Sequence, residues 1–184
     1  MHTVIPARRR RMERMWSPWR SQLLDKKEYD TQQTDLQGQS VFSRLVAEER
    51  DEENLIVWRG KHVFVIMNAY PYNNGHLLIV PYREIAQYGD LTKDEQIEIA
   101  HVIDRCIGWL RIALAPEGFN VGMNIGKAAG AGIPCHLHVH VVPRWSGDTN
   151  FMPVLGDVKV IPEAMRDTYR KLRKAIQAEE TALS

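Results

Sequence analysis

The sequence has few cysteines, no long apolar run and almost no excess of charge. Its 184 residues include two cysteines, Cys106 and Cys135, which belong to no Cys-x-x-Cys pair and cannot form a disulfide framework. No apolar stretch approaches the length of a membrane span, and the arginines at positions 8–11 are not followed by the apolar segment of a secretory signal. A net charge of +1 gives no general attraction to nucleic acid or membrane. We therefore expect a cytoplasmic protein without nucleic acid or membrane as partner.

The composition, with 44% apolar and 26% charged residues, is that of an ordinary globular chain. A chain of this length can bury a substantial core and corresponds to one domain with extensions. We expect the domain itself over residues 54–150. Residues 1–53 would be an N-terminal extension and arm, of which residues 1–11 are disordered, and residues 151–184 a C-terminal segment with a helix.

Apolar spacing predicts the secondary structure. Residues 55–58 and 62–67 flank a glycine turn and predict a hairpin, and residues 76–80, 119–124 and 136–142 predict three more strands. Thr92 and Glu95 have the spacing of a capping box, and apolar residues at helical intervals continue to Leu114. A short helix is expected over residues 41–49, and a C-terminal helix after Pro162. Because strands and helices are grouped, the order predicts an α+β fold with a five-stranded antiparallel sheet, one long helix and a C-terminal helix.

Three histidines alternate with apolar residues in the predicted fifth strand. A strand places His136, His138 and His140 on one face and the intervening apolar residues on the other. Core packing alone does not explain three imidazoles in a row, because each has two ring nitrogens that need hydrogen-bond partners. Three interpretations compete: histidines on the wet face of a half-exposed strand, ligands of zinc or another transition metal, and an active site in which one imidazole is base or nucleophile.

The segment before this row, residues 128–134, consists mainly of small residues. A ligand can approach the backbone N–H groups of such a segment closely, which suits a phosphate better than a metal ion. Because Gly130 and Gly132 precede a strand, they are not the dinucleotide fingerprint that opens a helix. The segment therefore favours the active-site interpretation.

The row fits the pattern His-φ-His-φ-His-φ-φ, in which φ is apolar, and a second block runs from Asn68 to Pro81 and contains Gly75-His76. Further matches are Met15 to Arg20, Gly118 to Asn124 and Pro143-Arg144-Trp145. With these motifs the chain resembles the histidine triad superfamily of nucleotide hydrolases and transferases. Together these motifs resemble the bacterial branch that includes diadenosine tetraphosphate phosphorylases. The resemblance implies the same fold, usually as a homodimer whose sheets join.

The resemblance also implies a role for each motif residue. His138 would be the nucleophile that attacks the α-phosphorus and forms a nucleotidyl-histidine intermediate, and His140 would contact the phosphoryl oxygens. His136 and His76 would hold the rings in register through hydrogen bonds. Asn68 would bind the ribose, and Asn124 the departing phosphate chain. Many members carry Gly-Gln-Ser/Thr-Val before the triad; here that side-chain amide and hydroxyl are missing, so backbone N–H groups of Gly130, Gly132 and Ile133 would meet the phosphates.

The implied activity is cleavage of a dinucleoside polyphosphate, with phosphate as acceptor of the nucleotidyl group. One alternative is a hydrolase that uses water and releases AMP from dinucleoside polyphosphates or nucleoside phosphoramidates. Another, of a different class, is a nucleotide-binding regulatory protein with little turnover. The scheme requires no cofactor and no protein-bound metal, although Mg²⁺ or another divalent ion can accompany the nucleotide phosphates.

Overall fold

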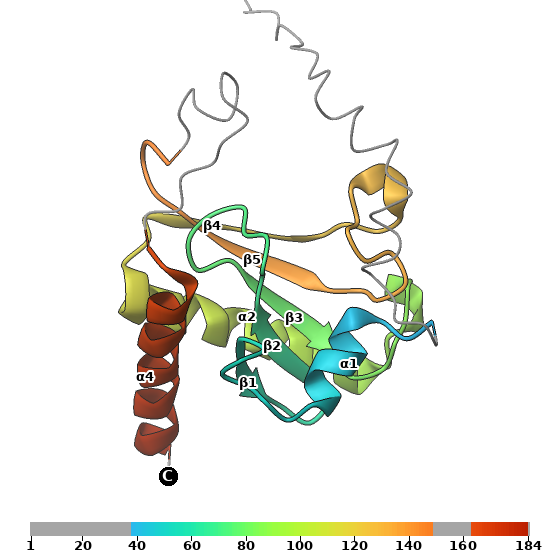
Figure 1. Cartoon of the computed structure of the whole chain (residues 1–184), viewed down its shortest axis with the longest axis horizontal. Helices are drawn as coiled ribbons and strands as arrows, with labels where there is room; N and C mark the ends of the chain where they lie inside the picture. Colours follow the sequence, from blue (N-terminus) through green and yellow to red (C-terminus); the bar gives the residue numbers. More distant parts are fainter. Residues whose placement is uncertain (1–37, 149–162, 184) are drawn as a thin grey trace, which may run out of the picture.

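The computed structural model describes residues 38–148 and 163–183 (Figure 1). Its centre is a five-stranded antiparallel sheet, as the sequence predicts, and the strands lie in the order β1-β2-β3-β5-β4. The strands are β1 (Ile56–Arg59), β2 (Val63–Met67), β3 (Leu77–Pro81), β4 (Gly118–Met123) and β5 (Val139–Arg144). The predictions for residues 1–11 and for the motif at residues 15–20 lie outside the described residues.

The predicted hairpin of β1 and β2 turns at Gly60 and is fastened to a helix. The N–H of Gly60 donates to the carbonyl of Val63 at 2.8 Å. The Glu98 carboxylate accepts from the N–H groups of Lys61 and His62 at 2.8 and 2.6 Å. A Cβ at position 60 would lie 2.3 Å from Glu98 Oε1, so only glycine permits this close approach.

The long helix α2 (Lys93–Leu114) begins at the predicted capping box. The Thr92 hydroxyl accepts from the Glu95 N–H at 3.2 Å, and the Glu95 carboxylate accepts from the Thr92 N–H at 2.7 Å. Arg83 pairs with the same carboxylate and, as the main cause, lowers the pKa of Glu95 to about 2. The helix ends at Ala115, whose φ of 48° is left-handed. Cys106 is fully buried on its apolar side, and burial raises the pKa of the thiol.

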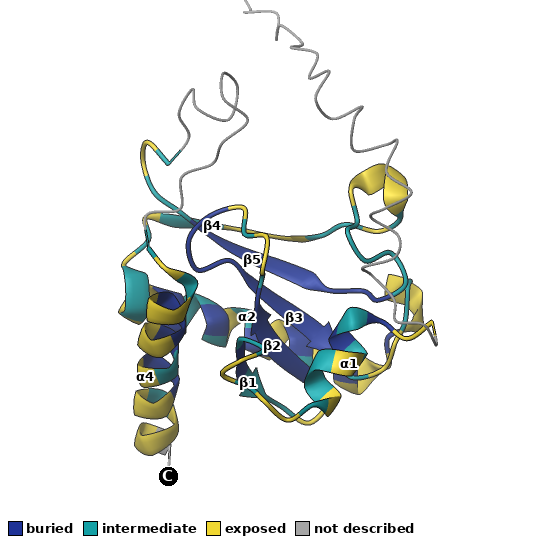
Figure 2. Ribbon diagram, in the orientation of Figure 1, coloured by how far each residue is buried: buried dark blue, intermediate teal, exposed yellow. Residues whose placement is uncertain are grey.

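Each face of the sheet has its own apolar cluster, so β2, β3 and nearly all of β5 are buried on both sides, whereas β4 is half-buried to exposed (Figure 2). On one face α2 and α4 (Met165–Leu183) pack against residues that include Val65, Ile79 and Val141. On the other face α1 (Val41–Ala47) places Phe42 against residues that include Phe64 and Leu78. No helix in the described ranges is long and apolar enough to cross a membrane.

Strand β4 forms an edge of the sheet. It pairs with β5 over its whole length, from Gly118 opposite Arg144 to Met123 opposite Val139. Its other side faces no strand of the described chain. Val121 is 44% exposed there, and Asn120 is also exposed. The strand therefore has unpaired backbone groups next to an exposed apolar side chain.

Candidate active site at the histidine row

The histidine row enters the sheet beside β3. Strand β5 begins at Val139, so His136 and His138 lie just before it and His140 lies within it. The three residues are 0, 5 and 8% exposed. Leu137 and Val139 belong to the cluster under α2, which confirms that the imidazoles share the opposite face. The interpretation of a half-exposed strand with a wet face is wrong, because both faces are buried.

The His136 ring uses both of its nitrogens within the protein. Nε2 lies 2.8 Å from the carbonyl of Pro81, which can only accept, so Nε2 carries the proton. Nδ1 is then the acceptor of a hydrogen bond from the Ser40 hydroxyl, at 2.9 Å. Burial lowers the pKa of His136, which keeps the ring neutral. The ring therefore bonds to neither of the other two histidines, and its link to the row is through the main chain.

His138 has one ring nitrogen held and the other open. Nδ1 lies 2.8 Å from the main-chain carbonyl of His136 and must donate to it. In the neutral ring this leaves a lone pair on Nε2, which has no hydrogen bond to a described residue. Burial lowers the pKa of His138. The imidazole thus has the protonation state that a nitrogen nucleophile requires.

His76 and His140 form a chain of directed hydrogen bonds. The main-chain N–H of Tyr72 donates to His76 Nδ1 at 3.0 Å, so a neutral His76 carries its proton on Nε2. That nitrogen lies 2.9 Å from His140 Nδ1 and donates to it. The proton of His140 is therefore on Nε2.

The N–H at His140 Nε2 is buried and has no hydrogen-bond partner in the described part of the chain. Burial and then the nearby His138 lower the pKa of His140 to about 4, so the ring is neutral at physiological pH. A buried donor without an acceptor costs on the order of 1–3 kcal/mol. A ligand that brought an oxygen to this point would recover that free energy.

Residues 68–75, the loop before β3, contact the rings of His76 and His140. Asn68 Nδ2 lies 3.3 Å from His76 Nδ1, and Asn68 Oδ1 accepts from the N–H of Tyr70 at 2.9 Å. The Tyr72 ring stacks on His140, with centroids 5.4 Å apart and planes inclined by 15°. Asn68, the predicted ribose ligand, is thus adjacent to the histidines. Tyr72 is an addition to the site, because its motif position gave no indication of this stacking.

The glycine-containing loop lies at the other end of the row. Asn124 Nδ2 donates to the Gly130 carbonyl at 3.4 Å, and the N–H of Gly130 donates to Lys127 at 3.0 Å. Gly130 therefore uses its N–H within the turn, where its φ of 83° favours glycine. The N–H groups of Gly132 and Ile133 donate to no described residue. Of the three predicted phosphate donors, these two are open in this structure.

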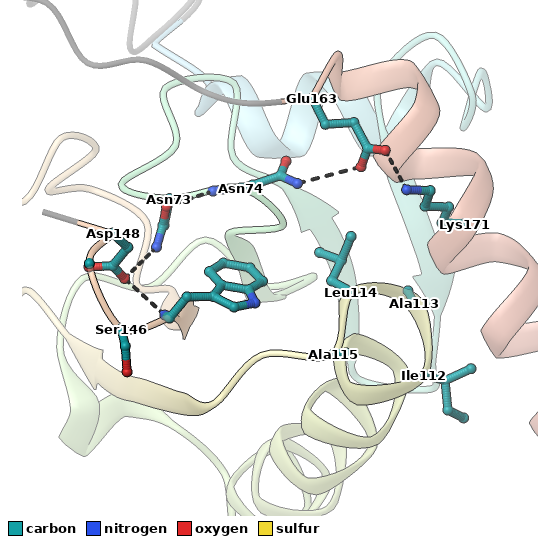
Figure 3. A pocket seen from close by; sticks show the side chains of 12 residues that line it. Asn73, Asn74, Ile112, Ala113, Leu114, Ala115, Ser146, Asp148, Glu163 and Lys171 are labelled. Carbon is teal, nitrogen blue, oxygen red and sulfur yellow. Dashed lines mark hydrogen bonds and ion pairs between the residues drawn. The ribbon is translucent and has the colours of Figure 1, made fainter.

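A cavity of about 770 Å³ lies apart from the histidines, between the loop before β3, the end of α2, the turn after β5 and α4 (Figure 3). Its polar side chains bond to one another: Asn73 donates to Asp148 at 2.8 Å, Asn74 to Glu163 at 3.5 Å, and Glu163 pairs with Lys171. None of the predicted site residues lines it. We assign it a structural role, because these bonds brace the loop that carries Asn68.

A buried row of three alternating imidazoles, backed by a fourth just before the neighbouring strand β3, defines a histidine triad domain. The chain belongs to the HIT domain family, whose model matches residues 49–147, more than half of the sequence. It is 40% identical over 174 residues to AP-4-A phosphorylase of Mycobacterium tuberculosis, covering 93% of this chain and 89% of that protein. A bis(5'-adenosyl)-triphosphatase of Saccharomyces cerevisiae is 32% identical over 108 residues, or 56% of this chain and 48% of the yeast protein.

Solved structures have the same fold. A Zn-bound histidine triad family protein from Mycobacterium smegmatis superposes with a TM-score of 0.63 and 25% identity, covering 77% of this chain and 96% of the other. In the present protein, the described residues contain no group of three or more His, Cys, Asp or Glu side chains that could hold a metal ion.

Proposed function

We propose that this protein cleaves dinucleoside polyphosphates such as diadenosine tetraphosphate and transfers the nucleotidyl group to inorganic phosphate. The observation that carries the proposal is a pair of ring nitrogens, the lone pair of His138 Nε2 and the N–H of His140 Nε2, neither of which is hydrogen-bonded to a described residue. One group can attack phosphorus while the other donates to a phosphoryl oxygen. The similarity to AP-4-A phosphorylase, which extends over most of both chains, supports this choice of substrate.

In the proposed reaction His138 Nε2 attacks the α-phosphorus of diadenosine tetraphosphate. A P–N bond forms as the P–O bond to the leaving ATP breaks, which leaves AMP attached to His138. An oxygen of inorganic phosphate then attacks the same phosphorus, the P–N bond breaks, and ADP is released. Negative charge on the transferred group is met by the N–H groups of His140, Gly132 and Ile133.

Two asparagines would orient the substrate. Asn68 would bind ribose hydroxyls once the nucleotide is seated, and Asn124 would meet the departing phosphate chain. Both lie in loops at the ends of the row, where their amides can turn from their present partners toward a ligand. A divalent ion such as Mg²⁺ would enter with the phosphates of the substrate. Activity in the presence and absence of a chelator measures that requirement.

A second candidate is a hydrolase in which water takes the place of inorganic phosphate, as the similarity to a bis(5'-adenosyl)-triphosphatase suggests. Incubation with diadenosine tetraphosphate, with and without phosphate, separates the two: ADP and ATP indicate phosphorolysis, and AMP and ATP indicate hydrolysis. His138→Ala should abolish either activity. A regulatory protein that only binds nucleotide would yield neither product set and would keep its affinity in this variant.

We also propose a homodimer in which β4 of two copies meets edge to edge. Two features support it: one side of β4 pairs with no described strand, and Val121 is exposed, so a second strand would satisfy the backbone groups and cover the apolar side chain. Sedimentation analysis of the wild type and of Val121→Lys tests this arrangement. A wild type that sediments as a monomer would contradict it.

A further inference from the structure

Two residues outside the stretch that matches the HIT domain model contact the histidine row. The match begins at residue 49, whereas Ser40 and Phe42 lie at the start of α1. Ser40 is fully buried, and its hydroxyl lies 2.9 Å from His136 Nδ1. The Phe42 ring meets His136 and His138 edge-on, at centroid distances of 5.6 and 5.2 Å.

Ser40 is held so that its hydroxyl proton must point at the imidazole. Its oxygen accepts from the Phe42 N–H at 3.3 Å as the N-cap of α1. Its main-chain N–H donates to Glu84 Oε2 at 3.0 Å. Within the part of the chain that the structure describes, the hydroxyl hydrogen therefore has one acceptor, His136 Nδ1, because the other nitrogen of that ring already donates to Pro81.

This arrangement fixes both the tautomer and the orientation of His136. A ring flip would break the bonds to Ser40 and Pro81 together, and an exchange of tautomer would set the Nε2 lone pair against the Pro81 carbonyl, in a site without water contact. The main-chain carbonyl of the same residue accepts the Nδ1 proton of His138. The position of that carbonyl decides which nitrogen of His138 keeps its lone pair.

We propose that Ser40, supported by Phe42, is a positioning residue for the nucleophile. By locking His136, it keeps the proton of His138 on Nδ1 and leaves Nε2 free to attack. The role in turnover rests on the function proposed above, but the effect on the tautomer does not. In Ser40→Ala, His136 Nδ1 loses its donor, the turn at residues 136–138 loosens, and His138 gains access to the tautomer with Nε2 protonated.

The chain offers a matched control in Ser43. Its hydroxyl bonds the same Glu84 carboxylate, also at 3.0 Å, but no imidazole. Ser40→Ala, Ser40→Cys and Ser43→Ala would be made in the full chain, and folding confirmed by urea titration. Cysteine fills the space of serine with a weaker donor and keeps the test informative should the alanine variant fail to fold.

The first readout is the ¹⁵N spectrum of the histidine side chains, which distinguishes protonated from unprotonated ring nitrogens without any substrate. His138 should be protonated on Nδ1 alone in the wild type and in Ser43→Ala. Ser40→Ala should show a mixture of tautomers, and Ser40→Cys a smaller change in the same direction.

The second readout is steady-state cleavage of diadenosine tetraphosphate. Loss of a group that orients a reacting histidine lowers activity by about 10–100-fold or more, so Ser40→Ala should lower kcat by at least about tenfold with KM within about threefold. A wild-type tautomer and kcat in Ser40→Ala, or equal losses in Ser40→Ala and Ser43→Ala, would overturn the proposal. A shifted tautomer in a protein whose wild type cleaves no dinucleotide would support the positioning role and refute the proposed reaction.

Discussion

Acidification should destabilise the protein at a pH where its carboxylates are still ionised, because of the histidine row. In the unfolded chain a histidine has a pKa of about 6.5, whereas burial and the adjacent His138 lower the pKa of folded His140 to about 4. Between these values the unfolded chain binds more protons than the folded protein, so the free energy of unfolding falls as the pH falls. This loss of stability through His140 is absent above about pH 7 and complete below about pH 4.

The size of the effect follows from the two pKa values. At pH 5, linkage through His140 alone removes about 2 kcal/mol of stability, an upper figure because a few per cent of the ring is exposed. His136 and His138, whose pKa values are also lowered, act in the same direction. The lowered pKa of Glu95 acts in a separate window: its contribution is present above about pH 4.5 and is lost as the pH falls toward 2.

The assay is urea unfolding at pH 7.5 and pH 5, applied to the wild type and to His140→Gln. The variant lacks the titrating ring, so its stability should fall by about 2 kcal/mol less than that of the wild type over the same interval. His101→Gln, a change at an exposed histidine on α2, is the control and should behave as the wild type does. Equal losses in all three proteins would refute the burial-based reasoning for the row.

Three further predictions concern the site and the fold. His138→Ala should lower turnover of diadenosine tetraphosphate by at least about 10³-fold with little change in dissociation constant, measured by product chromatography and calorimetry; retained turnover would exclude His138 as nucleophile. Tyr72→Ala should expose His140 and raise its pKa, moving the acid limb of kcat/KM to higher pH, whereas Tyr72→Phe should keep the wild-type profile because the stacked ring remains. Thr92→Ala should cost about 1 kcal/mol in urea unfolding and Thr92→Ser much less; equal losses would show that the hydroxyl cap does not stabilise α2.

Local patterns in the sequence were sufficient to predict the sheet and the long helix. The alternation of residues 136–141 sets the face of each side chain, and the spacing of Thr92 and Glu95 sets the start of α2. Both features depend on neighbours within a few residues, which sequence patterns record directly. The same holds for the hairpin at Gly60, although its tie to Glu98 could not be foreseen.

The partners of the imidazoles could not be predicted, because they come from distant parts of the chain. Ser40 and His136 are 96 positions apart, and Ser40 shows in the sequence only as a polar residue before a short apolar run. We predicted that His136 would hold the rings in register through hydrogen bonds; its main-chain carbonyl does bond the His138 ring, but its own imidazole bonds to Ser40 and Pro81. The N–H of Gly130 was predicted to be available to a phosphate, but it donates to the carbonyl of Lys127 within the turn. Hydrogen-bond direction is a property of the folded site.

The two open nitrogens of the row differ in polarity, which favours a phosphoryl ligand over a metal ion. A metal would need lone pairs from both His138 and His140. His138 Nε2 has one, but the lone pair of His140 is on Nδ1, where it accepts from His76. Reversing that bond would require the proton of His76 to move to Nδ1. That nitrogen already accepts a hydrogen bond from the main-chain N–H of Tyr72, so it cannot also carry a proton. A lone pair next to a donor instead matches an electrophilic phosphorus that carries anionic oxygens.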